Sequence, residues 1–302
     1  MISPIVPCIW LDDQAEAAAA AYAEIFPFTR VTAISRYPAT GENPSGRPPG
    51  SVLTVELELA KQRFTLLNGG PMFKPNPSVS FFVQVDTPAE ADRVFHALAE
   101  GGFVLMPIDR YPWSERYGWV ADRFGVSWQV MTTAPGAMGD TVIVPCLMFS
   151  GAIAGKAEEA IALYTSVFPH GRVELVDRYA SGEGPTGSVK HGRFTIAGQP
   201  MVAMDSHIEH RITFDEGLSL QVMCDDQATI DRYWDALVAG GGSHGPCGWL
   251  KDRFGLSWQV VPSSIAHWMA SPDTAARDRA FAAMMTMGKL DIATLDRAFR
   301  GA

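Results

Sequence analysis

One segment of the sequence occurs twice in this chain, and the duplication limits the folds open to it more than any other feature. The run 118–130, GWVADRFGVSWQV, returns at 248–260 as GWLKDRFGLSWQV, with changes at three positions. Shorter matches follow in the same order: Pro7-Cys8 with Pro145-Cys146, and Gly50-Ser51-Val52 with Gly187-Ser188-Val189. Because the matches keep their order, the chain is a tandem repeat of a unit of about 130 to 140 residues.

The composition excludes several classes of partner. The 302 residues are enough for two domains that each bury a core. There are 24 Lys and Arg against 33 Asp and Glu, with no basic run to follow a phosphate backbone, so we expect no nucleic-acid partner. No apolar stretch is long enough to cross a bilayer, and the start of the chain does not resemble a signal peptide. We therefore expect a cytoplasmic protein with no membrane partner.

The first part of each repeat reads as a strand, a helix and three strands. In the first repeat an apolar run at 5–10 predicts a strand and the alanine-rich segment 15–23 predicts a helix. Strands are expected at 30–37, 51–59 and 63–68, and the second of these alternates between leucine or valine and polar residues.

The second part of the repeat has the same order again. It predicts a strand at 79–86, a helix at 88–100 that ends at a glycine pair, and strands at 104–108, 118–122 and 127–131. Each repeat is thus two βαβββ modules, and the chain holds four.

These elements suggest boundaries along the chain. We expect a first domain at 1–133, a linker rich in Pro and Gly at 134–140, a second domain at 141–262 and a helical tail at 263–302. The tail has no counterpart in the first repeat. Its methionines fall at helical spacing, which favours packing on a domain or a neighbouring subunit over a cofactor site.

Paired βαβββ modules resemble the vicinal oxygen chelate superfamily, which includes glyoxalase I, extradiol dioxygenases and bleomycin resistance proteins. Local motifs are similar to its PhnB-like branch, often labelled a 3-demethylubiquinone-9 3-methyltransferase domain: Pro7-Cys8-Ile9-Trp10, Leu67-Asn68-Gly69-Gly70, Ser80-Phe81 and Asp252-Arg253-Phe254-Gly255. The resemblance implies an α+β fold with two glyoxalase/bleomycin-resistance-like domains. It also implies a small organic ligand in sheet-lined clefts, and pairing of the two halves as an intramolecular pseudo-dimer or of whole chains as a homo-oligomer.

The reaction stays open at this point. The alternative to simple binding is a divalent-metal-dependent lyase or dioxygenase of the same superfamily, and a purely structural module is favoured if side chains fill the clefts. A methyltransferase is less favoured, because such enzymes usually place a glycine-rich turn between a strand and a helix. The glycine cluster at 240–242 follows a helix instead.

The resemblance places ligand slots on the first and fourth strands of each module. They fall near Cys8, Asn68, Ser80 and Gln129 in the first repeat, and near Cys146, Asp205, Ser219 and Gln259 in the second. Glu56 is a further ligand-binding candidate, although a solvated glutamate is the favoured interpretation there. The two glutamines are expected to bond a ligand in the cleft, and the cysteines at 8 and 146 to be small buried side chains, since no histidine partners them.

A metal centre needs several fixed nitrogen or oxygen ligands. Histidine is absent from all eight slots, and only the second repeat offers an acid beside a histidine, at Asp205 and His207. We therefore expect no metal in the first repeat, and we expect any divalent ion in the second repeat to be lost on changing Asp205 to Ala.

Overall fold

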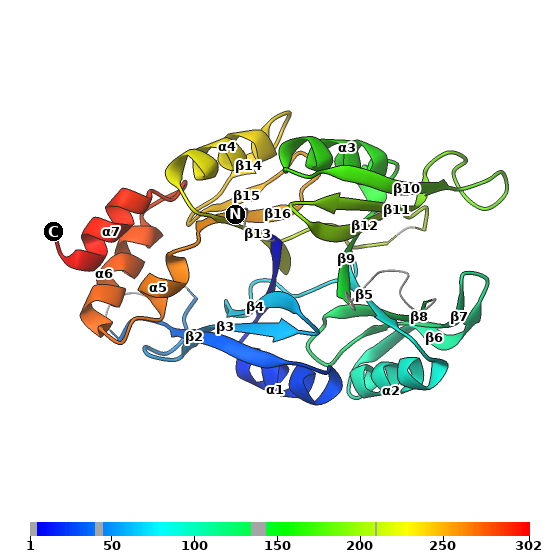
Figure 1. Cartoon of the computed structure of the whole chain (residues 1–302), viewed down its shortest axis with the longest axis horizontal. Coiled ribbons are helices and arrows are strands. Elements are labelled where there is room, and N and C mark those ends of the chain that lie inside the picture. Colours follow the sequence, from blue (N-terminus) through cyan, green and yellow to red (C-terminus); the bar gives the residue numbers. More distant parts are fainter. Residues whose placement is uncertain (1–4, 40–44, 134–142, 209) are drawn as a thin grey trace.

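The computed structural model describes residues 5–39, 45–133, 143–208 and 210–302, and it contains the four expected βαβββ modules. They span residues 5–68, 79–132, 143–205 and 218–262. The linker expected at 134–140 lies outside the described residues. The modules build two sheets of eight strands, and the helices cover the outer faces of these sheets (Figure 1).

Sheet A has the strand order β14-β15-β16-β13-β1-β4-β3-β2, so it joins the first module to the fourth. Its strands are β1 (Ile5–Leu11), β2 (Arg30–Arg36), β3 (Val52–Leu59), β4 (Gln62–Asn68), β13 (Leu218–Cys224), β14 (Ser243–His244), β15 (Trp249–Lys251) and β16 (Ser257–Pro262).

Sheet B has the order β10-β11-β12-β9-β5-β8-β7-β6 and joins the third module to the second. Its strands are β5 (Val79–Val85), β6 (Phe103–Tyr111), β7 (Ser114–Ala121), β8 (Ser127–Thr132), β9 (Ile143–Phe149), β10 (Arg172–Arg178), β11 (Val189–Ile196) and β12 (Gln199–Asp205).

Strand pairing therefore crosses between the repeats. Strand β1 pairs antiparallel with β13, which sets Cys8 opposite Ser219, and β5 pairs antiparallel with β9, which sets Ser80 opposite Cys146. The grouping of ligand slots by repeat was wrong, because each cleft takes one module from each half. The halves are paired as a pseudo-dimer that shares both sheets.

The repeated Asp-Arg-Phe-Gly motif holds the two modules of one repeat together. The carboxylate of Asp122 accepts hydrogen bonds from Tyr22 Oη at 2.7 Å, from Trp128 Nε1 at 2.8 Å and from two backbone N–H groups. Asp252 makes the same four bonds, with Tyr164 and its own following residues. Both tyrosines come from the first helix of their repeat, so the strongest sequence signal is a structural one.

The helices follow the expected periodicity. The modules contribute α1 (Ala15–Ile25), α2 (Pro88–Ala99), α3 (Ala157–Val167), preceded by the short η1 (Gly151–Ile153), and α4 (Gln227–Val238). The tail forms α5 (Ile265–Met269), α6 (Thr274–Met285) and α7 (Ile292–Arg300). Asp273 and Asp291 each cap a tail helix by accepting a backbone hydrogen bond in its first turn.

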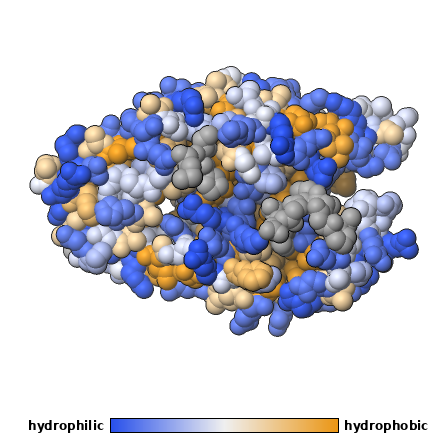
Figure 2. Space-filling model, viewed as in Figure 1, coloured by the Kyte–Doolittle hydropathy of each residue, from blue (hydrophilic) through white to orange (hydrophobic). Residues whose placement is uncertain are grey.

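The tail packs against sheet A, at the left of Figure 1. Trp268, Met269 and Phe281 form a buried cluster with Tyr37, which follows β2, and with Val261 of β16. On the face seen in Figure 2, hydrophobic residues lie in small groups among hydrophilic ones. None of the helices in the described ranges has the length and apolar character needed to cross a membrane.

Candidate ligand-binding cleft

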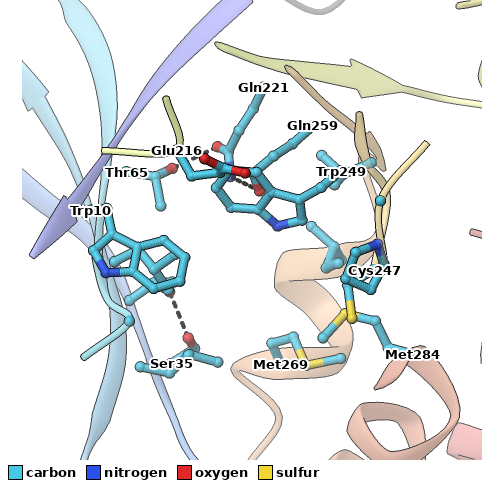
Figure 3. A pocket seen from close by; sticks show the side chains of 18 of the residues that line it. Trp10, Ser35, Thr65, Glu216, Gln221, Cys247, Trp249, Gln259, Met269 and Met284 are labelled. Atoms are coloured by element: carbon cyan, nitrogen blue, oxygen red, sulfur yellow. Dashed lines mark hydrogen bonds between the residues drawn. The ribbon is translucent and has the colours of Figure 1, made fainter. Parts of the chain in front are cut away.

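The inner face of sheet A bounds a cavity of about 990 Å³, which we call cleft A. Strands of the first and fourth modules supply its floor and two walls, and helices α5 and α6 of the tail supply another wall. In Figure 3, Trp10 and Trp249 flank the polar floor, while Met269 and Met284 from the tail lie on the remaining side. The tail is thus part of the site rather than an appendage.

A row of polar residues crosses the floor of cleft A. The strand register sets Glu56 beside Thr65, Thr65 beside Cys8, Cys8 beside Ser219, and Ser219 beside Ser257. Neighbours in register project from the same face of a sheet, so these five side chains form one line over five strands. Glu56, Thr65 and Ser257 contact the cavity itself.

A hydrogen-bond chain connects two glutamines above this row (Figure 3). Thr65 Oγ1 donates to Gln221 Oε1 at 2.8 Å, and Gln221 Nε2 donates to Gln259 Oε1 at 3.2 Å. Gln259 Nε2 then donates to Ser219 Oγ at 2.8 Å. Each amide nitrogen carries two N–H groups, so Gln221, whose Nε2 makes one of the hydrogen bonds above, keeps one donor for another partner. The chain fixes both amides, and Gln221, which is half-buried, lines the cavity.

The two predicted cysteines are inert. Burial raises the pKa of the Cys8 thiol to about 12, although hydrogen bonds with Gln259 and Ser219 oppose this. Burial raises the pKa of Cys146 to about 12 in the same way, against hydrogen bonds with Ser80 and Gln129. Both thiols stay protonated near neutral pH, which agrees with their interpretation as small buried side chains and not as nucleophiles.

The structure places Glu56 in cleft A and not at a solvated surface. Burial raises the pKa of its carboxyl group, and the positive charge of Arg63 opposes this shift. Both side chains line the cavity. A second acid on the wall, Glu216, is paired with Lys251 at 3.0 Å. Cleft A therefore offers one acidic group that can exchange a proton with a ligand.

Asn68, by contrast, does not line cleft A. Its Oδ1 accepts a hydrogen bond from the backbone N–H of Ala15 at 2.9 Å, and its Nδ2 donates to the carbonyl of Val52 at 3.0 Å. The side chain thus joins β4 to the start of α1. Side chains alternate along a strand, so a slot placed one residue away falls on the opposite face. Arg63, Thr65 and Leu67, which alternate along β4, are its residues that line the cavity.

Asp205 has the equivalent position in sheet B. Its Oδ1 accepts from the backbone N–H groups of Gly155 and Ala157, at 2.8 and 3.1 Å, and its Oδ2 accepts from Val189 at 2.9 Å. The ring of His207 lies 5.3 Å from that of Tyr179. Within the described residues there is no group of three or more His, Cys, Asp or Glu that could hold a metal ion. An ion at Asp205 and His207 stays a prediction.

Sheet B has the same backbone plan, but side chains fill its inner face. Gln129 Nε2 donates to Ser80 Oγ at 2.8 Å, as Gln259 does to Ser219, yet Gln129 Oε1 accepts from Tyr117 Oη at 2.7 Å. This tyrosine corresponds to Cys247 in sheet A, and Phe82 corresponds to Gln221. They pack in one buried cluster with Val144, Cys146 and Val202.

Sequence reasoning did not single out Thr65, Gln221 or the tail methionines as site residues. The two repeats differ at these places, since Gln221 replaces Phe82 and Thr65 replaces Val202. A comparison of one repeat with the other, rather than a search for residue types that bind ligands, would have identified Thr65 and Gln221. The tail would have been identified as the segment that has no counterpart in the first repeat.

The comparisons with known proteins agree with this architecture. A family model described as 3-demethylubiquinone-9 3-methyltransferase matches the chain twice, over residues 3–131 and 141–261. A PhnB protein from Bacillus cereus is 34% identical over 43% of this chain and 100% of its own, with a TM-score of 0.39. Glyoxalase I from Zea mays is 11% identical over 86% of this chain and 93% of its own, with a TM-score of 0.53, which shows a shared fold.

The search of curated proteins gives no match. The family model covers both repeats, and the strand order and the repeated motif follow one plan in the two copies. The chain therefore belongs to the PhnB-like 3-demethylubiquinone-9 3-methyltransferase family, in two tandem copies, and shares the fold of glyoxalase I.

Proposed function

We propose that cleft A binds a small, largely apolar organic molecule and that sheet B has a structural role. The contrast between the two inner faces supports this. They share backbone, serine and glutamine, but cleft A is open with a volume of about 990 Å³, whereas Tyr117 and Phe82 fill the other face. Small-molecule sites in proteins have this size and this pattern of apolar walls with few polar groups.

The proposed orientation follows from the walls. The polar end of the molecule lies on Gln221 and Thr65, whose remaining donor and acceptor capacity faces the cavity. Its apolar body contacts Trp10, Trp249 and the tail methionines. Glu56 can take or give a proton, which leaves room for acid–base chemistry on a bound molecule.

The alternative, a metal-dependent lyase or dioxygenase, needs several oxygen or nitrogen ligands around one ion. The floor of cleft A offers Glu56 and the glutamine amides for this purpose, and glutamine is a weak ligand alone. Methyl transfer, which the family description names, is not our proposal, because the chain lacks the glycine-rich strand–turn–helix segment noted above.

A ligand-stabilisation screen of the full chain tests the proposal. We expect small aromatic and aliphatic alcohols to raise the unfolding temperature, since a ligand that binds the folded state stabilises it. Gln221→Phe introduces the residue of sheet B into cleft A and should abolish the shift. Phe82→Gln, the reverse change in sheet B, is the matched control and should retain it. If no compound stabilises the wild type, or if Gln221→Phe responds like the wild type, cleft A is not the binding site.

A further inference from the structure

Trp10 is a fixed platform on one side of cleft A. Its Nε1 donates to the carbonyl of Gly70 at 2.8 Å, and the edge of Phe73 contacts it with ring centroids 5.1 Å apart. The indole lies directly on Gly69, where an added Cβ atom would be 2.2 Å from the ring. Neither the bonded edge nor the packed face of this indole can move without losing these contacts.

Trp249 is held far less firmly. Its ring meets that of Trp10 edge to face, with centroids 6.0 Å apart, and no described group accepts a hydrogen bond from its indole nitrogen. Nearby, Ser257 Oγ is completely buried and likewise has no hydrogen-bond partner in the part of the chain that the structure describes. A buried hydroxyl without a partner is unfavourable, so Ser257 calls for an explanation.

The equivalent tryptophan and serine in sheet B supply this explanation. Trp119 and Ser127 occupy the equivalent strand positions, and there Trp119 Nε1 donates to Ser127 Oγ at 2.7 Å. The register is the same in sheet A, with Trp249 beside Gln259 and Lys251 beside Ser257. The backbone positions of Trp249 and Ser257 thus match those at which their counterparts form the bond.

We propose that Trp249 has a second position, bonded to Ser257, and that it moves there when a planar aromatic ring takes its place against Trp10. This rests on the proposed function and names the ligand class: a flat aromatic molecule with a neutral polar substituent for Gln221. In the present position Trp249 contacts Trp10, and its indole N–H is not bonded to Ser257 Oγ, which is buried without a partner. With a ligand ring on Trp10, the aromatic contact is kept and both groups are paired, so the ligand favours the second position.

Calorimetric titration of the full chain with two alcohols tests the ligand class. The probes are 2-naphthol, which is planar, and its saturated analogue decahydro-2-naphthol, which has a hydroxyl group at the same position but no flat ring. We expect 2-naphthol to bind about tenfold more tightly. Ser257→Ala should weaken 2-naphthol binding about fivefold, the effect of one neutral hydrogen bond, and leave the saturated analogue unchanged. Ser127→Ala, the matched change in sheet B, should alter neither affinity.

A measurement on the wild type does not depend on how any variant folds. In a ¹⁵N spectrum of the indole groups, the Trp249 signal is identified by its absence in Trp249→Phe. On adding 2-naphthol, this signal should shift downfield in the proton dimension and exchange with solvent more slowly. In Trp249→Phe the indole bond cannot form, so a further Ser257→Ala change should have no effect on affinity.

The outcomes separate the two proposals. Equal affinities for the two alcohols, no effect of Ser257→Ala and an unmoved Trp249 signal would overturn this inference while leaving cleft A as a binding site. Failure of both alcohols to bind or stabilise the chain would overturn both.

Discussion

Two side chains decide whether an inner face is open. Gln221 and Cys247 border the cavity of cleft A, whereas the larger Phe82 and Tyr117 fill the same places in sheet B. The residues that the two copies share, such as the buried serines and glutamines, form the floor in both sheets. Whether an inner face is open therefore depends on the side chains that differ between the repeats, not on those they have in common.

Replacing Asp205 should show whether it is a cap or a metal ligand. Asp205→Ala leaves three backbone N–H groups without an acceptor and should lower the free energy of unfolding by about 1–3 kcal/mol. Asp205→Asn should cost less, because Asn68 serves the same position in sheet A. Urea unfolding of both variants, with metal analysis of the purified protein, provides the test. A stoichiometric ion that Asp205→Ala releases would support a metal site there.

Glu56 should make stability depend on pH. Burial raises its folded-state pKa, so the folded protein binds this proton more tightly than the unfolded chain does. The resulting stabilisation is complete below the ordinary glutamate pKa and is lost as pH rises through the raised value. Glu56→Gln should therefore be more stable than the wild type at about pH 7, and the gap should narrow at about pH 4.

Glu58 on the same strand is the matched control. Its hydrogen bond with Arg30 lowers its pKa, so Glu58→Gln should lose stability near neutral pH and not under acid conditions. Unfolding curves at both pH values give the difference in free energy of unfolding between each of the two variants and the wild type. The same sign for both variants would contradict the burial of Glu56.

At the scale of elements, the buried aspartates tie helices to strands of the neighbouring sheet. Tyr22 lies on α1, which packs on β3 and β4 of sheet A, while Asp122 lies between β7 and β8 of sheet B. Each sheet combines one module from each repeat. On the outer, helical side, by contrast, the tyrosine–aspartate hydrogen bonds join the two modules of the same repeat. This gives a structural reason for the aspartate in the longest match between the copies, a run that also contains Trp249, Ser257 and Gln259 of cleft A.

Tyr22→Phe removes one of the four hydrogen bonds to a buried carboxylate. We expect the free energy of unfolding to fall by about 1–3 kcal/mol, and Tyr164→Phe to have an effect of the same size in the second repeat. Tyr111→Phe, whose hydroxyl bonds the carbonyl of Pro107 at the surface, is the control and should change little. Chemical denaturation measures all three. If Tyr22→Phe leaves the free energy of unfolding unchanged, the motif does not join the modules.

The order of the elements could be predicted from the sequence because periods of 2 and 3.6 residues distinguish strands from helices within each module. The pairing of β1 with β13 could not be predicted. The first strands of all four modules are similar short apolar runs, and the sequence does not distinguish which of them pairs with the free edge of β1. The sequence also did not show which alternate residues of β4 face the cavity. A shift of one residue exchanges Asn68 for Leu67 and reverses the face.

The whole molecule should assemble from separate repeats. Residues 1–133 alone would expose the edges of β1 and β5, which pair with β13 and β9 of the other repeat. Because such edges bind complementary strands, we expect chains 1–133 and 141–302 to copurify as a 1:1 complex when they are expressed together. Size-exclusion chromatography with light scattering checks this. Two stable, independent monomers would argue against the shared sheets.

Sharing of both sheets also has a consequence for how such a protein can diverge. If two identical single repeats paired in this way, the twofold axis would make their two clefts identical, and any substitution would enter both at once. Joining the repeats in one chain removes that constraint, because a residue such as Tyr117 can fill one face while its counterpart, Cys247, leaves the other open. Tandem fusion thus allows one inner face to stay open while the other becomes a packed core.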